Sequence, residues 1–245
     1  MAAEETKARK ARERPLIPTG IAAFDAMIGG GLPNGSVIAI IGDPGSGHRL
    51  FAQQILYFKA RYEDVKVCYL TIEDPPSDVA FEMAGYGWNL DEVGDKWEFI
   101  DGYTPRLDVR RGVAGSRVIL DLATLKLPSM LKEGKWTVID TFSYYLLLYD
   151  LKDVLDIIDV LTAHARKYGG LHFLILIHGL HEQKSITTVS HFTDGLFDFN
   201  IRHEEAEATG IIRIKKLARA HHTMRSIPYR ITSEGIMIET AVRIA

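Results

Sequence analysis

A glycine-rich loop between an apolar run and a helix-forming stretch constrains the fold of this chain more than any other feature. Residues 36–41 predict a buried strand, and residues 42–47 read Gly-Asp-Pro-Gly-Ser-Gly. Glycines let the backbone wrap closely around an anion, and the first N–H groups of the following helix point at phosphate oxygens. The pattern therefore predicts a phosphate-binding loop formed by Gly42, Asp43, Pro44, Gly45, Ser46, Gly47, His48, Arg49 and Leu50.

Two positions after the last glycine depart from the usual motif, which has Lys followed by Ser or Thr. His48 and Arg49 stand there instead. Loss of the lysine removes a charge-assisted hydrogen bond worth about 1.5–3 kcal/mol, so we expect weakened binding of ATP or ADP. A protonated His48 can still donate to a phosphate.

Arg49 is the sharper change, because a guanidinium cannot ligate Mg²⁺. We expect Arg49 to occupy the place of the metal ion, which makes a Mg²⁺ requirement doubtful. The alternative is that His48 and Arg49 both point to solvent over an empty loop.

Acidic residues follow two other predicted strands. Residues 66–72 lead into Glu73 and Asp74, at the end of a parallel strand where α/β sheets place their ligands. A general base for water is expected there; alternatively Asp74 or Ser77 merely caps the next helix. Residues 136–140 form an apolar run closed by Asp140, which matches the Walker B pattern whose aspartate organises Mg²⁺. As a second possibility, Asp140 pairs with Arg49.

Strand-like and helix-like stretches alternate from residue 16 onward, which is typical of strand–helix units around a parallel sheet. We expect strands over residues 36–41, 66–72, 98–101, 136–140 and 171–177, with an amphipathic helix over 151–165. Period-2 patterns over 196–202, 211–216 and 229–239 predict antiparallel strands. The prediction is a charged mobile tail over residues 1–15 and one α/β domain over 16–245, with a mostly parallel sheet flanked by helices.

Composition narrows the classes of protein that remain. The net charge of −3, the single cysteine and the 47% apolar content exclude a disordered chain and a disulfide scaffold and favour a cytoplasmic protein. The apolar run at 171–177 is far shorter than the roughly 18 residues that a membrane helix needs. Direct DNA binding is not expected, because the candidate DNA-binding loop, residues 181–193, carries one lysine. Nine histidines without acids at ligand spacing do not favour a metal site.

These motifs together resemble the KaiC-like group of the RecA superfamily of P-loop ATPases, including archaeal RadA paralogues, from residue 17 to residue 238. The segments that carry the resemblance are 18–25, 29–35, 42–47, 71–74, 87–90, 193–196 and 215–229. The resemblance implies a RecA-like core and a ring, often hexameric, with ATP held between subunits. It further implies that Lys216, Arg219 and His222 contact the nucleotide of the neighbouring subunit.

Departures from that family pattern affect three parts of the ATPase. His48 and Arg49 alter the loop, Ala218 stands where the family has its arginine with Arg219 one place late, and residues 177–179 read Ile-His-Gly where small polar residues are usual. An arginine finger alone can contribute about 10³ to 10⁵ in rate. We therefore expect a regulatory or scaffolding pseudo-ATPase in a homomeric or mixed ring, with hydrolysis very slow or absent.

Two alternatives stay open at this point. One is a working ATPase of unusual type in which Glu73, with Asp74, positions water. The other is a ligand-free interaction partner of an active paralogue, for which DNA would be an indirect partner.

Overall fold

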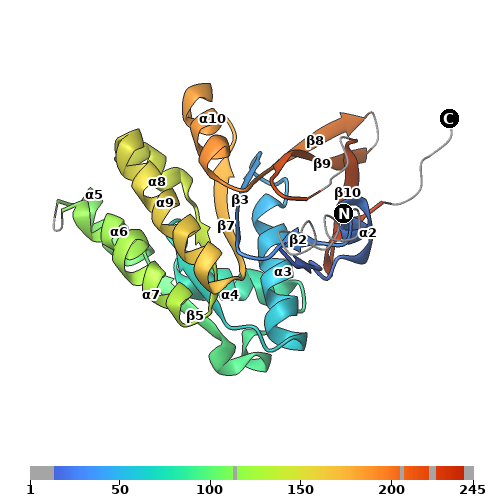
Figure 1. Ribbon diagram of the computed structural model, residues 1–245, viewed down its shortest axis with the longest axis horizontal. Helices are drawn as coiled ribbons and strands as arrows, with labels where there is room; N and C mark the ends of the chain where they lie inside the picture. Colours follow the sequence, from blue (N-terminus) through green and yellow to red (C-terminus); the bar gives the residue numbers. More distant parts are fainter. Residues whose placement is uncertain (1–13, 113–114, 205–206, 221–224, 240–245) are drawn as a thin grey trace, which may run out of the picture.

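A nine-stranded sheet forms the centre of the computed structural model, which describes residues 14–112, 115–204, 207–220 and 225–239 (Figure 1). The strand order is β11-β10-β9-β8-β3-β7-β6-β4-β5. The strands are β3 (Ser36–Gly42), β4 (Val67–Thr71), β5 (Trp97–Asp101), β6 (Trp136–Asp140), β7 (Leu171–Ile177), β8 (Gly195–Glu204), β9 (Glu207–Leu217), β10 (Ile227–Thr232) and β11 (Gly235–Ile238). The pairs from β8 to β5 are parallel, and those from β8 to β11 are antiparallel. The predicted mixed α/β architecture is confirmed.

Helices cover both faces of this sheet. They are α2 (Ala22–Met27), α3 (His48–Tyr62), α4 (Pro76–Gly85), α5 (Tyr103–Arg110), α6 (Arg117–Asp121), α7 (Leu127–Lys132), α8 (Ser143–Leu148), α9 (Leu151–Tyr168) and α10 (Gln183–Phe192). Three short turns of helix, η1 (Leu90–Glu92), η2 (Gly94–Lys96) and η3 (Leu122–Lys126), join them, and β1 (Leu16–Ile17) pairs with β2 (Leu32–Pro33). No helix of the described segments has the length and apolar character needed to cross a bilayer.

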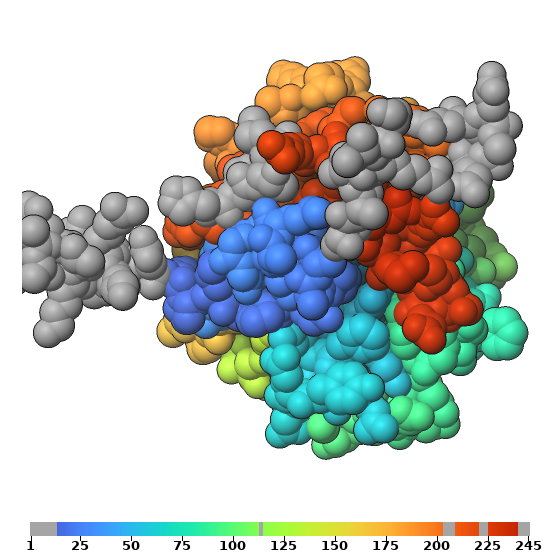
Figure 2. Space-filling view, turned by 90° about the vertical axis from the view of Figure 1, so that its right-hand side faces the viewer, coloured from blue at the N-terminus to red at the C-terminus, as the bar shows by residue number. Residues whose placement is uncertain are grey.

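The two faces hold separate apolar cores because side chains alternate along each strand. On β3, Ile38 and Ile40 pack toward α3, while Val37 and Ala39 pack toward α9. The predicted apolar stripe of α9 is buried at Val154, Ile158, Leu161 and Ala165. Seen from the side, the N-terminal segment and the C-terminal strands lie next to each other above α3 (Figure 2).

Two predicted segments differ from the structure. Residues 229–239 do not form one strand, because Ser233 and Glu234 make a turn that divides them into the hairpin β10–β11. Residues 181–193 are not a loop, since most of them form α10. The period-2 pattern continues across the hairpin turn and so conceals the break between β10 and β11. In α10, the two apolar residues Ile186 and Val189 alone are too few to predict a helix.

Candidate functional site

The phosphate loop joins the end of β3 to the start of α3, as predicted. Gly45 and Gly47 have φ values of 82° and 73°, a left-handed conformation that glycine adopts without strain. Ser46 N–H donates to the carbonyl of Asp43 at 2.9 Å and closes the turn. A Cβ added at Gly45 would meet nothing within 4 Å, so this edge of the loop is open.

A cavity of about 340 Å³ lies beside the loop. It is lined by Pro44, Gly45, Gly47, His48, Arg49, Leu50, Glu73, Asp74, Glu82, Tyr86, Asp140, Thr141, Ile175, Ile177 and Ile231. The structure therefore brings most of the predicted loop residues and all three predicted acids to one cleft. The loop follows β3, and the acids follow β4 and end β6. They meet because these parallel strands end at one edge of the sheet.

Arg49 is the centre of an ion-pair cluster at the base of this cleft. Its Nη1 lies 2.7 Å from Oδ2 of Asp74, its Nη2 pairs with Glu82, and its Nε lies 3.4 Å from Oδ2 of Asp140. Burial acts to lower the pKa of Arg49, but the nearby carboxylates, Asp140 foremost, raise it above its ordinary value. The side chain is 22% exposed. The alternative in which Arg49 points to solvent is therefore wrong.

Asp140 ends β6 and is almost fully buried. Tyr69 on β4 donates its hydroxyl to the same oxygen that faces Arg49. Burial raises the pKa of Asp140 to about 6, against the lowering effects of Arg49 and of the Tyr69 hydrogen bond. Asp140 thus meets Arg49 in the pairing considered as the second possibility from sequence.

His48 lies inside the loop with 8% of its surface exposed. Its Nδ1 is 3.0 Å from the hydroxyl oxygen of Ser46, and its Cγ lies 2.7 Å from where a Cβ at Gly42 would sit. Burial, followed by the positive charges of His178 and Arg49, lowers the pKa of His48 to about 4. The ring is therefore neutral at pH 7, so His48 does not carry the charge of the lysine it replaces; its contact with phosphate stays a prediction.

The acids after β4 have different surroundings. Asp74 pairs with Arg49, and α4 begins after Pro75 without a side-chain cap. The alternative in which Asp74 or Ser77 caps this helix is therefore wrong. A proline in the first turn already supplies a helical φ angle. Glu73 lines the cavity with an exposed side chain, while its carbonyl accepts a hydrogen bond from Arg106 at 3.1 Å.

The hairpin β10–β11 braces the loop from outside the parallel sheet. Tyr229 donates its hydroxyl to the carbonyl of Ser46. A Cβ at Gly47 would lie 2.8 Å from Cδ1 of Ile231. Farther along α3, the amide of Gln54 accepts from Ile236 N–H at 2.7 Å and donates to its carbonyl at 3.2 Å. Sequence reasoning missed this brace, since no local pattern pairs residues about 180 positions apart.

His178 connects the loop to β8, a role that was not predicted from the sequence. Its Nδ1 is 2.9 Å from Asp43 and its Nε2 is 2.9 Å from Asp198, so both ring nitrogens donate and the ring is an imidazolium. The hydrogen bond to Asp198 is the main cause that raises the pKa of His178. Burial opposes ionisation of Asp198, but His178 and Lys215 hold its pKa near 2. The signal available in the sequence was an acid between two phenylalanines, Phe197 and Phe199.

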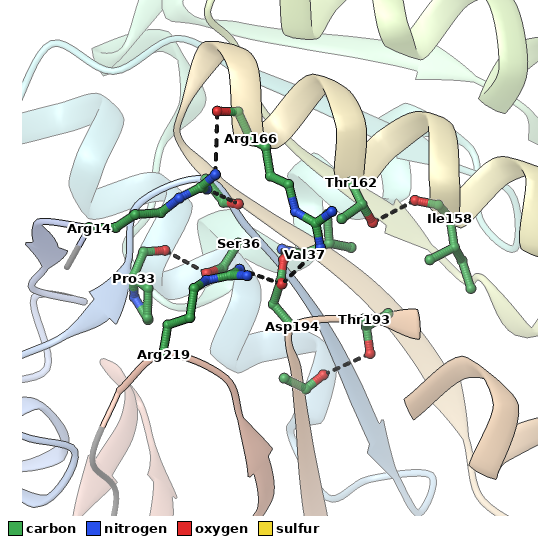
Figure 3. A network of polar contacts seen from close by, with 12 residues as sticks. Arg14, Pro33, Ser36, Val37, Ile158, Thr162, Arg166, Thr193, Asp194 and Arg219 are labelled. Atoms are coloured by element: carbon green, nitrogen blue, oxygen red, sulfur yellow. Dashed lines mark hydrogen bonds and ion pairs between the residues drawn. The ribbon is translucent and has the colours of Figure 1, made fainter. Parts of the chain in front are cut away.

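The predicted contacts to a neighbouring subunit lie away from this cleft. Lys216 donates to the carbonyls of Ser190, His191 and Thr193 at 2.6–2.8 Å, at the end of α10. Arg219 pairs with Asp194, which also accepts Val37 N–H at 3.0 Å at the start of β3 (Figure 3). His222 lies outside the described residues. Lys216 and Arg219 therefore make contacts within the chain, and their contact with a neighbouring nucleotide stays a prediction.

Histidine, cysteine and acidic side chains do not gather in groups of three or more that could hold a metal ion, as far as the described residues show. Where a Walker-type aspartate would face Mg²⁺, Asp140 faces the guanidinium of Arg49 instead. The loop suits a phosphate at Gly45, which lines the cavity and has open space around it. The donors around Asp140 do not suit a divalent cation, which Arg49 would repel.

Comparison with known proteins identifies the family of the chain. Residues 17–242 match the family of KaiC ATPases. The chain belongs to the KaiC family of ATPases. The chain is similar to a UPF0273 protein of Thermotoga maritima, 26% identical over 91% of this chain and 95% of the relative. The circadian clock oscillator protein KaiC of Prochlorococcus marinus is 32% identical over 63% of this chain and 28% of that protein.

The solved structure of a KaiC-like protein from Pyrococcus horikoshii shares the fold. It superimposes with a TM-score of 0.71, at 20% identity, over 92% of this chain and 99% of the other. This likeness confirms the RecA-like core expected from the motifs.

Proposed function

We propose that this KaiC-family chain binds ATP or ADP weakly and without Mg²⁺, and that it serves as a regulatory or scaffolding pseudo-ATPase. The observation that carries the proposal is the position of Arg49, which pairs with Asp74, Glu82 and Asp140 at the base of the cleft. A protein cation stands there in place of the metal that a Walker-type site recruits. Bound nucleotide would supply the phosphates that the loop N–H groups hold.

Different residues of the cleft would bind the phosphates and orient water. Backbone N–H groups of residue 45 and of residues 47–49 hold the phosphates, since the N–H of Ser46 closes the turn onto Asp43. Arg49 exchanges one of its carboxylate partners for a phosphate oxygen. Because neutral His48 supplies no positive charge, affinity is expected to be lower than in a loop with lysine by about 10-fold to 150-fold. Glu73 is the candidate that orients water, but the altered loop keeps hydrolysis very slow or absent.

Calorimetric titration with ATP and ADP, with and without Mg²⁺, tests this proposal. We expect binding whose affinity changes less than threefold when Mg²⁺ is chelated. The double variant His48→Lys/Arg49→Thr restores the usual motif and should bind more tightly and in a Mg²⁺-dependent way. A strong Mg²⁺ requirement in the unaltered chain would contradict the proposal, and binding by the restored variant alone would favour a ligand-free scaffold.

A second candidate function is a working ATPase that uses Glu73. Steady-state phosphate release distinguishes it from the pseudo-ATPase. This candidate is favoured by the place of Glu73 at the cavity wall. Release that falls at least tenfold in Glu73→Gln, with unchanged nucleotide affinity, would establish it. We expect no measurable difference in phosphate release between Glu73→Gln and the unaltered chain.

Assembly is a further part of the proposal. We expect a homomeric ring, hexameric by resemblance, or a mixed ring with a paralogue. Sedimentation velocity of the full chain with and without nucleotide tests the homomeric case, for which a monomer at all concentrations is the contrary result.

A further inference from the structure

The ring of His178 lies between two carboxylates that belong to different parts of the fold. Its Nδ1 is 2.9 Å from Oδ1 of Asp43 in the phosphate loop, and its Nε2 is 2.9 Å from Oδ1 of Asp198 on β8. The backbone N–H of His178 donates to the carbonyl of Gly42 at 3.0 Å, which fixes the residue to the end of β3. One side chain therefore joins the phosphate loop to the first strand of the antiparallel part of the sheet.

The two ring contacts depend on two protons, because an ionised carboxylate only accepts hydrogen bonds. A neutral ring carries one proton, so its other nitrogen turns a lone pair toward a carboxylate. The side chain of Asp198 is 5% exposed and has no access to bulk water, whereas that of Asp43 is 48% exposed. A neutral His178 therefore keeps its proton on Nε2 for Asp198, and Asp43 turns to solvent.

The charged groups next to the ring favour its protonated form. The hydrogen bond to Asp198 is the main cause that raises the pKa of His178; burial opposes the rise, and Asp43 adds to it. Lys215 on β9 reaches the ring only through Asp198, its partner at 2.5 Å. The ring consequently loses its proton at a pH above about 6.5, the ordinary pKa of histidine.

Other titratable groups around His178 are neutral at pH 7. His48, at the start of α3, has a pKa lowered to about 4 by burial. Burial also lowers the pKa of His181, in the segment after β7. The residues of α10 that line the cavity beside His178 are uncharged. Asp43 and Asp198 are therefore the groups that decide how the ring titrates.

Asp43 stands at a point on which the shape of the phosphate loop depends. Its carbonyl accepts from Ser46 N–H and closes the loop turn. The next residue, Pro44, lines the nucleotide cleft. Loss of the contact with His178 frees the side chain of Asp43 and leaves its negative charge without a cation close to the place of the phosphates. Both effects weaken the binding of an anion.

We propose that His178 is a positioning residue that regulates the nucleotide cleft by holding Asp43 against β8. The loop is held while the ring bonds to both carboxylates, and it loosens when the bond to Asp43 is lost. This role of His178 rests on the proposed function, because it concerns the affinity of the same cleft for ATP or ADP. Its contribution to affinity is complete below about pH 6.5 and is lost as the pH rises through the pKa of His178.

A pH titration of the isotope-labelled full chain without nucleotide, followed by nuclear magnetic resonance, tests the link between ring and loop. We expect the ring nitrogens of His178 and the backbone amides of Gly45 and Ser46 to shift with one common midpoint. Shifts confined to Asp198 and its neighbours on β8 would overturn the proposal, and so would loop amides that do not follow the ring.

Calorimetry with ADP tests the consequence for binding. The affinity of the unaltered chain is divided by that of His178→Asn at each pH, which cancels the ionisation of the nucleotide itself. We expect a ratio of about 3 to 10 at about pH 6.5 that falls to near one at about pH 9, because the asparagine amide does not titrate and donates to one carboxylate only.

His191→Asn is the matched control, since His191 is exposed on α10. Its affinity should equal that of the unaltered chain at every pH. A ratio for His178→Asn that does not change with pH would refute the role of His178 and leave nucleotide binding intact. Absence of ADP binding in all three chains would contradict the proposed function instead, and the titration without nucleotide would still decide whether His178 holds the loop.

Discussion

The Nε atom of Arg49 lies 3.4 Å from Oδ2 of Asp140, and Tyr69 donates a hydrogen bond to that same oxygen. One oxygen of the buried carboxylate at the end of β6 thus contacts two protein groups. The cationic one of these two groups is the arginine at the second position of α3.

Arg49→Ala should destabilise the protein, because it leaves Asp140 buried without its cation. We expect a loss of about 3–5 kcal/mol in the free energy of unfolding at pH 8. The loss should shrink at pH 5, since the pKa of Asp140 is raised to about 6 and its neutral form predominates below that. Urea unfolding at both pH values measures this. Arg61→Ala, which breaks an exposed pair with Glu92, should cost under about 1 kcal/mol at either pH, and a pH-independent loss in Arg49→Ala would contradict the account.

His172 should make stability fall in acid. Burial lowers its pKa to about 4, while Nε2 donates to the carbonyl of Gly169 and Nδ1 accepts from Thr137. In the unfolded chain its pKa is about 6.5. Its contribution is therefore present above pH 6.5 and is lost as the pH falls toward 4. His172→Gln keeps a donor for Gly169 without the titration, so its unfolding free energy should fall less steeply from pH 6.5 to 4.5. Parallel profiles for the two proteins would refute this assignment.

Tyr229→Phe removes the hydrogen bond that holds the carbonyl of Ser46. We expect a loss of about 0.5–1.5 kcal/mol in stability and a several-fold weaker nucleotide affinity, because the loop loses preorganisation. Chemical unfolding and calorimetry measure the two effects. Tyr62→Phe is the control, since Tyr62 is 75% exposed and should change neither. Unchanged affinity in Tyr229→Phe would show that the hairpin does not position the loop.

Gly235→Ala should be much more costly than alanine at another left-handed glycine. The new Cβ would lie 2.5 Å from Cζ2 of Trp88 and 2.7 Å from Oε1 of Gln54, at a φ of 112°. We expect a loss of about 2–4 kcal/mol, measured by thermal unfolding. Gly134→Ala provides the comparison, because at φ 79° it meets nothing within 4 Å, and about 1 kcal/mol is expected there. Equal losses in unfolding free energy for Gly235→Ala and Gly134→Ala would mean that backbone strain alone sets the cost of both substitutions.

Local patterns predicted the parallel part of the fold well, because a buried strand followed by a glycine-rich loop leaves few other solutions. They placed Arg49, Asp74 and Asp140 on separate strands and helices, and topology then brought these residues together. Patterns could not predict the acid Glu82 beside Arg49, because α4 meets α3 only through tertiary packing. Nor could they predict the protonation of His48, since its low pKa follows from burial that the sequence does not show.

Tyr229 and Ile236 have a consequence for how the phosphate loop forms during synthesis. The loop itself leaves the ribosome early, yet the hydrogen bonds that hold Ser46 and Gln54 come from residues 183 and 182 positions later in the chain. Domains form as units as the chain emerges. A nascent chain that carries the whole glycine-rich segment therefore still lacks a finished nucleotide cleft until the hairpin β10–β11 has been made, so premature nucleotide capture by partial chains is disfavoured.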